Sequence, residues 1–224
     1  MKKVCIPIFL VLCMFLFSSC AQPARVTLQV DELKLDNGGY GWPGAEYGTS
    51  LIDLEKQTGY TFPSVPFSSD RGERLRNNFN EKEVFDYRND SNYGQATFQA
   101  LQNGTGVLVE YGVFTGNLLF EFYHDELRTT YVYFGNKPVS IDPDMNFGGK
   151  KNDVAAVYES LLEDLTRYYG DPEQRTMPEV DQATWAFSPT DGAVEKYRLS
   201  LMHSFPANGD EMTVLQIGYW VKEN

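Results

Sequence analysis

The chain contains two histidines, so any histidine-dependent chemistry must use His124 or His203. His124 stands beside Asp125 between two strand-like runs, and His203 lies near the end of another run. A hydrolytic triad needs a nucleophile on a constrained turn and a histidine that a carboxylate orients. The chain has no Gly-x-Ser-x-Gly elbow, so the sequence does not predict a triad.

Acidic side chains are abundant, with 31 Asp and Glu residues against 19 Lys and Arg residues. Two carboxyl groups can cleave a glycosidic bond, but only when they face each other across a cleft at a suitable separation. The spacing of acidic residues along this chain does not fix such a pair. A glycan hydrolase that uses paired carboxylates therefore stays open as one possible function.

The segment between residues 142 and 153 has the spacing of a calcium loop. Asp142, Asp144, Asn146 and Asp153 occupy loop positions one, three, five and twelve, before a predicted helix. Phe147 stands where such a loop needs glycine, and short Asp and Asn residues also suit turns and helix caps. Both a calcium site and a metal-free turn stay open. The sequence predicts no other cofactor, and zinc is disfavoured because no Cys and His spacing supplies its ligands.

The first 19 residues read as a secretory signal. Lys2 and Lys3 precede an apolar run that extends from Val4 to Phe17, and small residues follow it. This run is shorter than the roughly 20 residues that a helix needs to cross a bilayer. We therefore expect removal of the segment and no retained membrane span.

The end of this leader, Phe17-Ser18-Ser19-Cys20, resembles the lipobox of bacterial lipoproteins. The resemblance implies that Cys20 is acylated and becomes the mature N-terminus, which would anchor the protein to the extracytoplasmic side of a cell membrane. Cys5 and Cys13, the other two cysteines, lie inside the leader. The folded part is therefore expected to contain no disulfide.

Composition limits the possible partners. The formal net charge of −12 disfavours nucleic acid, which selects clustered Lys and Arg. A hydrophobic content of 42% in 224 residues is enough for a sizeable core.

Two segments have the pattern of helices. Val154, Val157, Leu161, Leu165 and Tyr168 fall on one stripe, which predicts an amphipathic helix. Asn152 or Asp153 can cap its start, and Gly170 with Pro172 can end it. Residues 50–58 predict a shorter helix between a Ser50 cap and a Gly59 stop.

Alternating or β-branched runs predict strands around these helices. The runs are Leu118–Tyr123, Leu127–Phe134, Val84–Arg88, Gln95–Leu101, Gly106–Phe114, Ala183–Ser188, Lys196–His203 and Met212–Val221. A two-residue loop at His124 and Asp125 would place Glu121 opposite Arg128, whereas a three-residue loop would not.

These elements predict an α+β fold of one or two antiparallel sheets with helices packed on one face. Residues 20–49 are expected to form a lipid-anchored tether and loop, and residues 136–153 a turn-rich connector. Residues 50–135 and 154–224 are expected to form two α+β halves. Each half has the order of a helix followed by antiparallel strands, which allows two helix-then-meander repeats.

This order is similar to that of β-lactamase-inhibitor-like domains and of small SmpA/OmlA-type envelope lipoproteins. The resemblance rests on the helix end Tyr168-Tyr169-Gly170-Asp171-Pro172, on Trp185, and on the alternation of Tyr197, Leu199 and Leu201. It implies the fold, but it implies no inhibitory function, because the folded part cannot form the disulfides of the inhibitor proteins.

Aromatic residues are the candidate binding groups. Tyr40 and Trp42 could stack against a sugar ring or a peptide, or they could pack into the domain. Tyr131 and Tyr133 could face a partner from the sheet, or they could be half-buried packing residues. The expected function is a membrane-anchored, non-enzymatic module that binds or scaffolds an envelope protein or peptide. A lipoprotein that binds calcium or a small ligand is a further alternative.

Overall fold

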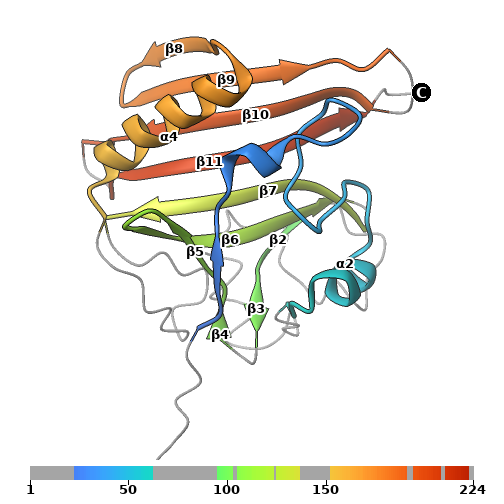
Figure 1. Ribbon diagram of the computed structural model, residues 1–224. Coiled ribbons are helices and arrows are strands. Elements are labelled where there is room, and N and C mark those ends of the chain that lie inside the picture. Colours follow the sequence, from blue (N-terminus) through green and yellow to red (C-terminus); the bar gives the residue numbers. More distant parts are fainter. Residues whose placement is uncertain are drawn as a thin grey trace, which may run out of the picture.

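A computed structural model describes residues 23–62, 95–102, 105–123, 125–136, 152–190, 194–207 and 210–221 (Figure 1). Its helical elements are η1 (Val30–Leu33), α2 (Leu51–Thr58) and α4 (Val154–Tyr169). The strands of the first half are β1 (Arg25–Thr27), β2 (Gln95–Gln99), β3 (Leu101–Gln102), β4 (Thr105–Gly106), β5 (Leu108–Tyr111), β6 (Phe114–Tyr123) and β7 (Glu126–Gly135). Those of the second half are β8 (Glu173–Met177), β9 (Val180–Phe187), β10 (Val194–Ser204) and β11 (Met212–Val221).

The described strands form one large sheet and one small one. The large sheet has nine strands in the order β1-β5-β6-β7-β11-β10-β9-β8, with β2 also paired to β6. Its pairs are antiparallel except β1 with β5, and β3 pairs with β4 in the small sheet. The last strands of the two predicted halves, β7 and β11, pair with each other, so both halves share one sheet.

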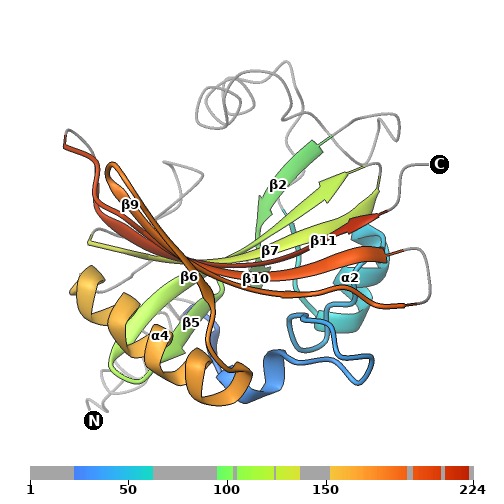
Figure 2. The same ribbon diagram turned by 90° about the horizontal axis from the view of Figure 1, so that it is seen from above.

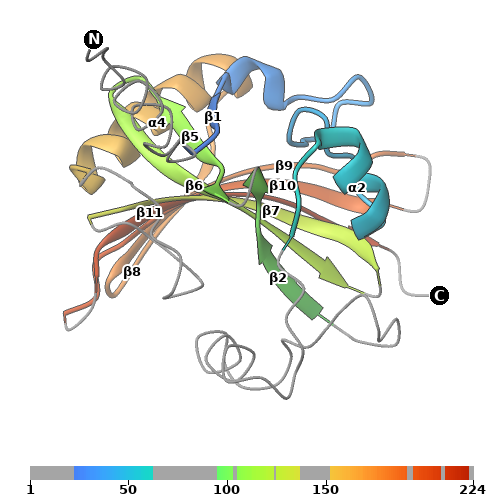
Figure 3. The same ribbon diagram turned by 90° about the horizontal axis from the view of Figure 1, so that it is seen from below.

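The helices lie on one face of this sheet, as Figures 2 and 3 show from opposite sides. Val157, Leu161 and Leu165 of α4 are fully buried in the same core cluster as Leu51 and Leu54 of α2. The core-facing side chains of the strands alternate with side chains on the opposite face. The predicted α+β fold with helices on one face is therefore confirmed.

The order of a helix followed by a meander holds in the second half, where β8, β9, β10 and β11 pair in sequence after α4. The first half differs, because β2 and β5 both pair with the same side of the long strand β6. The chain leaves this edge between the two strands to form β3 and β4.

Both α2 and α4 begin and end at the residues that the sequence predicts, but the backbone conformation at the end of α4 differs from the expected one. Ser50 accepts the Asp53 N–H at 3.2 Å, and Gly59 is left-handed at φ 70° and ψ 7°. Asp153, not Asn152, caps α4 by accepting the Ala156 N–H at 3.2 Å. Gly170 has φ 81° but ψ −173°, a conformation that glycine alone adopts readily, instead of the left-handed helical one.

The β6–β7 hairpin has a two-residue loop without the Glu121–Arg128 ion pair that such a loop suggested. Tyr123 pairs with Glu126, which leaves two residues in the loop, one of the two loop lengths that the sequence left open. An irregularity then shifts the register, so Glu121 lies opposite Thr129, and the inference that a two-residue loop would pair Glu121 with Arg128 is wrong. Arg128 instead bonds to Glu126.

The segment from residue 23 to residue 49 belongs to the folded body, which corrects the prediction of a tether over these residues. Strand β1 pairs with β5 in parallel, and Leu28, Val30 and Leu33 are buried in the core. The signal segment, Cys20, the strand expected at Val84–Arg88 and most of the 136–153 connector lie outside the described residues.

Candidate functional site

The sheet face opposite the helices is here called the far face, and its side chains form rows that run across the strands. Residues that pair across the strands share a face, so the strand register fixes each row. The first row consists of Glu173, Thr184, Ser200, Gln216, Tyr131, Leu119 and Gln99. The row beside it consists of Arg175, Gln182, Met202, Val214, Tyr133, Asn117 and Leu108.

The middle of the far face carries a polar and aromatic group, the Tyr131 cluster, made of Glu121, Tyr131, Tyr133 and Gln216. The two tyrosine rings have centroids 5.7 Å apart. The Tyr131 hydroxyl donates to Glu121 Oε2 at 3.1 Å, and Gln216 Nε2 donates to the Tyr131 hydroxyl oxygen at 3.5 Å. All four side chains are partly buried, so each presents some surface to solvent.

The electrostatics of the cluster keep both tyrosines neutral. Burial raises the pKa of Tyr133 to about 12, and the Glu121 carboxylate contributes to the increase. Burial, followed by the charge of Glu121, also raises the pKa of Tyr131. Phenols with raised pKa values are poor bases and poor nucleophiles near neutral pH. Their rings and hydroxyl groups instead suit contact and hydrogen bonding.

A pocket of about 60 Å³ lies on the far face near β8, at one end of the sheet. Its lining is Glu173, Arg175, Gln182, Thr184 and Arg198, from β8, β9 and β10. Arg175 donates to Glu173 Oε1 through Nε at 2.9 Å and through Nη2 at 2.7 Å. This hydrogen bond from Arg175 is the main cause of the lowered pKa of the Glu173 carboxyl.

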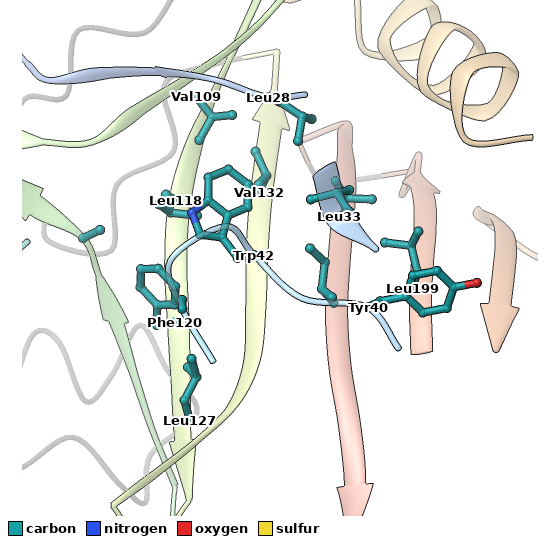
Figure 4. Close-up of a cluster of buried hydrophobic side chains, with 14 of the residues drawn as sticks. Leu28, Leu33, Tyr40, Trp42, Val109, Leu118, Phe120, Leu127, Val132 and Leu199 are labelled. Atoms are coloured by element: carbon teal, nitrogen blue, oxygen red, sulfur yellow. The ribbon is translucent and has the colours of Figure 1, made fainter. Parts of the chain in front are cut away.

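Tyr40 and Trp42 are core residues, which corrects their placement in a binding platform. Their exposed fractions are 6% and 5%. Figure 4 shows Trp42 among Leu118 and Val132, and Tyr40 near Leu199. The edge of the Tyr40 ring also meets Tyr169 of α4, with centroids 5.5 Å apart. Of the two alternatives for these residues, packing into the domain describes the structure.

The calcium ligands predicted from the sequence are only partly within the described structure. Asp142, Asp144 and Asn146 lie outside it. Asp153 lies within it and caps α4. The described residues contain no group of three or more His, Cys, Asp or Glu side chains that could hold a metal ion. Calcium binding by this loop therefore stays a prediction.

His203 has a defined environment on the helix side of the sheet. Its Nε2 lies 2.8 Å from Glu211 Oε1, and its side chain is 12% exposed. Its ring packs near Tyr158 and Phe205, with centroid distances of 5.6 and 5.2 Å. These contacts show that the His203 side chain packs against its neighbours and has a structural role. His124 lies outside the described residues.

Glu121 and Gln216 are the members of the Tyr131 cluster that sequence reasoning missed as site residues. Strand alternation places Glu121 on the same face as Leu119 and Tyr123, but the sequence offered only Arg128 as its partner, and only for a two-residue loop. Gln216 joins Tyr131 only through the pairing of β11 with β7, and these strands are distant in sequence. No local pattern could have supplied that contact.

None of the described helices is long and apolar enough to cross a membrane. In comparisons with known proteins, the chain matches no protein-family model, no curated protein and no solved structure.

Proposed function

We propose that the protein is a non-enzymatic binding or scaffolding module of the cell envelope. Acyl chains on Cys20 would hold it at the extracytoplasmic side of a membrane, as the lipobox-like leader implies. Its partner would be an envelope protein or peptide, bound through the Tyr131 cluster on the far face.

The observation that carries this proposal is the position and exposure of the Tyr131 cluster. Glu121, Tyr131, Tyr133 and Gln216 lie on the face opposite α2 and α4, at the centre of a broad sheet. Tyrosine is enriched at protein interfaces because its ring supplies contact area at low entropic cost and its hydroxyl forms hydrogen bonds.

The polar members of the cluster favour a polypeptide as the ligand. Glu121 and Gln216 each keep some exposed surface, and together they offer both an acceptor and donors to peptide groups. The net charge of −12 disfavours nucleic acid and anionic lipid as the ligand.

Site-specific photo-cross-linking in the envelope tests the proposal. A photoreactive phenylalanine derivative replaces Tyr133 in one version of the full chain and Tyr168 in another. Tyr168 is a matched control, because it is 50% exposed on α4, away from the far face. We expect a discrete cross-linked protein adduct from position 133 and none of the same mass from position 168. No adduct at 133, or the same adduct from both positions, would contradict the proposed binding face.

A further inference from the structure

Strand β8 ends the large sheet, and no other strand of the described residues pairs with its outer edge. It is the last strand in the order of the described sheet, and it pairs with β9. All five of its residues, Glu173–Met177, are exposed. Figure 1 shows β8 at the outer margin of the sheet, on the opposite side from β1 and β5.

The hydrogen-bond pattern identifies which backbone groups of β8 point outward. The N–H of Phe205, just after β10, donates to the carbonyl oxygen of Glu179, just before β9, at 2.9 Å. Hydrogen-bonded positions recur at every second residue of an antiparallel pair, so the backbone groups of the odd-numbered residues of β9 bond to β10. Even-numbered residues of β9 therefore bond toward β8, where their partners are Glu173, Arg175 and Met177. The backbone N–H and C=O groups of Gln174 and Thr176 consequently point away from the sheet.

The side chains along this edge carry a self-complementary charge pattern. Glu173 and Arg175 are two residues apart, so they share the far face. If a second copy lies antiparallel with its Gln174 opposite Gln174, each Glu173 faces Arg175 of the other copy. These pairs would occupy non-hydrogen-bonded positions, where Cα atoms are about 4.5 Å apart and side chains lie closest.

Two other antiparallel registers also pair the outward backbone groups of Gln174 or Thr176 with those of a second copy, but they do not place Glu173 against Arg175. Pairing Gln174 with Thr176 of the second copy places Arg175 against Arg175, which is repulsive. Pairing Thr176 with Thr176 places Arg175 against Met177, which pairs no charges. The edge charges therefore select the register centred on Gln174.

We propose that two copies of the protein associate edge to edge through β8, about a two-fold axis at Gln174. The backbone groups of the two Gln174 residues bond reciprocally, and each Thr176 N–H donates to the carbonyl oxygen of Pro172 in the other copy. Pro172 lacks an N–H, but its carbonyl group is sufficient for this contact.

The symmetry has a consequence for the proposed binding face. Because Glu173 and Arg175 of both copies lie on one side, the axis is perpendicular to the sheet. The dimer would form one continuous sheet with both far faces on the same side and all helices on the other. The contact does not depend on what the far face binds.

Charged side chains on an edge usually prevent association with foreign strands. Here the same charges admit one partner in one register, because only a matching sequence pairs them. The contact is short, so we expect a weak, reversible dimer that membrane anchoring would strengthen by raising the local concentration.

Disulfide trapping in the full chain tests both association and register. Gln174→Cys, Arg175→Cys and Thr176→Cys are oxidised separately at equal protein concentration, and dimers are followed on non-reducing gels beside wild type. Paired strands place the two Gln174 Cα atoms within disulfide range, so Gln174→Cys should form dimers at least about tenfold faster than the other two. Equal rates at the three positions, a faster rate at 175 or 176, or no dimer above the wild-type level would overturn the proposal.

A charge exchange tests the ion pairs. Arg175→Glu places like charges across the axis and should slow dimer formation in the Gln174→Cys background. The double change Glu173→Arg/Arg175→Glu restores opposite charges and should recover the original rate. If the double change stays as slow as the single one, the charges do not set the register, and the proposed pairing fails.

Discussion

Asn152 bonds to the backbone of Thr115 through both ends of its side-chain amide. Its Oδ1 accepts the Thr115 N–H at 3.0 Å, and its Nδ2 donates to Thr115 O at 2.9 Å. Nδ2 also donates to Gly135 O at 3.0 Å. Asn152 is 6% exposed, so one buried amide joins β6, the end of β7 and the residue before the Asp153 cap of α4.

Replacing Asn152 with alanine should be costly. The change leaves the buried N–H of Thr115 without its acceptor and Thr115 O without its donor, while Gly135 O keeps only the backbone N–H of residue 152. We expect a loss of about 2–4 kcal/mol in the free energy of unfolding, because unsatisfied buried groups keep their desolvation cost. Urea denaturation measures it. Asp153→Ala is the control, since it removes only the N-cap and should cost about 1 kcal/mol. Equal losses in both variants would show that the Asn152 bonds contribute little.

Two strand glycines should respond differently to alanine. A Cβ at Gly116 would lie 2.9 Å from Tyr133 O and 2.9 Å from Val132 Cγ1, so Gly116→Ala should destabilise by about 1–3 kcal/mol. At Gly218 the nearest atoms are 3.5 Å away, an ordinary contact. Gly218→Ala should change stability by less than about 1 kcal/mol. Thermal unfolding of the two variants measures the difference, and similar melting temperatures would contradict it.

Stability should fall in alkaline solution because buried tyrosines resist ionisation. Burial, together with the hydrogen bond to Asp164, raises the pKa of Tyr111 from its ordinary value of 10.0 to about 12. Burial also raises the pKa of Tyr169 to about 12. Because the pKa of these tyrosines is higher in the folded state, the unfolded chain loses their hydroxyl protons at a lower pH than the folded protein does. The stabilisation is therefore complete below pH 10.0 and is lost as the pH rises toward about 12.

Urea midpoints measured from about pH 8 to about pH 11 test this dependence. We expect the midpoint to be level at first and to decline above the ordinary tyrosine pKa. Tyr111→Phe should start lower, because the hydrogen bond to Asp164 is gone, and then decline less steeply. A midpoint that stays constant to the alkaline limit, or an unchanged slope in Tyr111→Phe, would refute the assignment.

The elements that sequence reasoning located well are those with local signals. The stripe of Val157, Leu161 and Leu165 and the flanking Asp153 and Gly170 are contained within one segment, so α4 could be placed without its surroundings. Strand β11 was predicted with its observed bounds because it is a run of β-branched, aromatic and other apolar residues between charged ones. By contrast, β8 was missed because all five of its residues are exposed, so it carries no apolar alternation.

The candidate site was predicted only in part, for a physical reason. Successive side chains of a strand point to opposite faces of the sheet. In β7, Val132 and Phe134 point into the core, so Tyr131 and Tyr133 lie on the other face. The contact of Tyr131 with Gln216 depends on sheet order, which the sequence of one strand does not encode. The exclusion of Trp42 from a binding platform likewise depends on tertiary packing, because a glycine-rich loop can fold inward or stay exposed.

The membrane anchor is testable at a single atom. If the lipobox-like leader is processed, the Cys20 sulfur is the site of acylation, and each buried CH₂ of its chains contributes about 0.8 kcal/mol to membrane binding. Metabolic labelling with an alkyne fatty acid should mark wild type in the membrane fraction and leave Cys20→Ser unmarked. Cys13→Ser is the matched control: it changes a cysteine inside the leader and should keep the label. Label that persists in Cys20→Ser, or that is absent from wild type, would remove the anchor from the proposed function. The photo-cross-linking test of the far face would still stand, because the Tyr131 cluster is built from residues of β6, β7 and β11 and does not include Cys20.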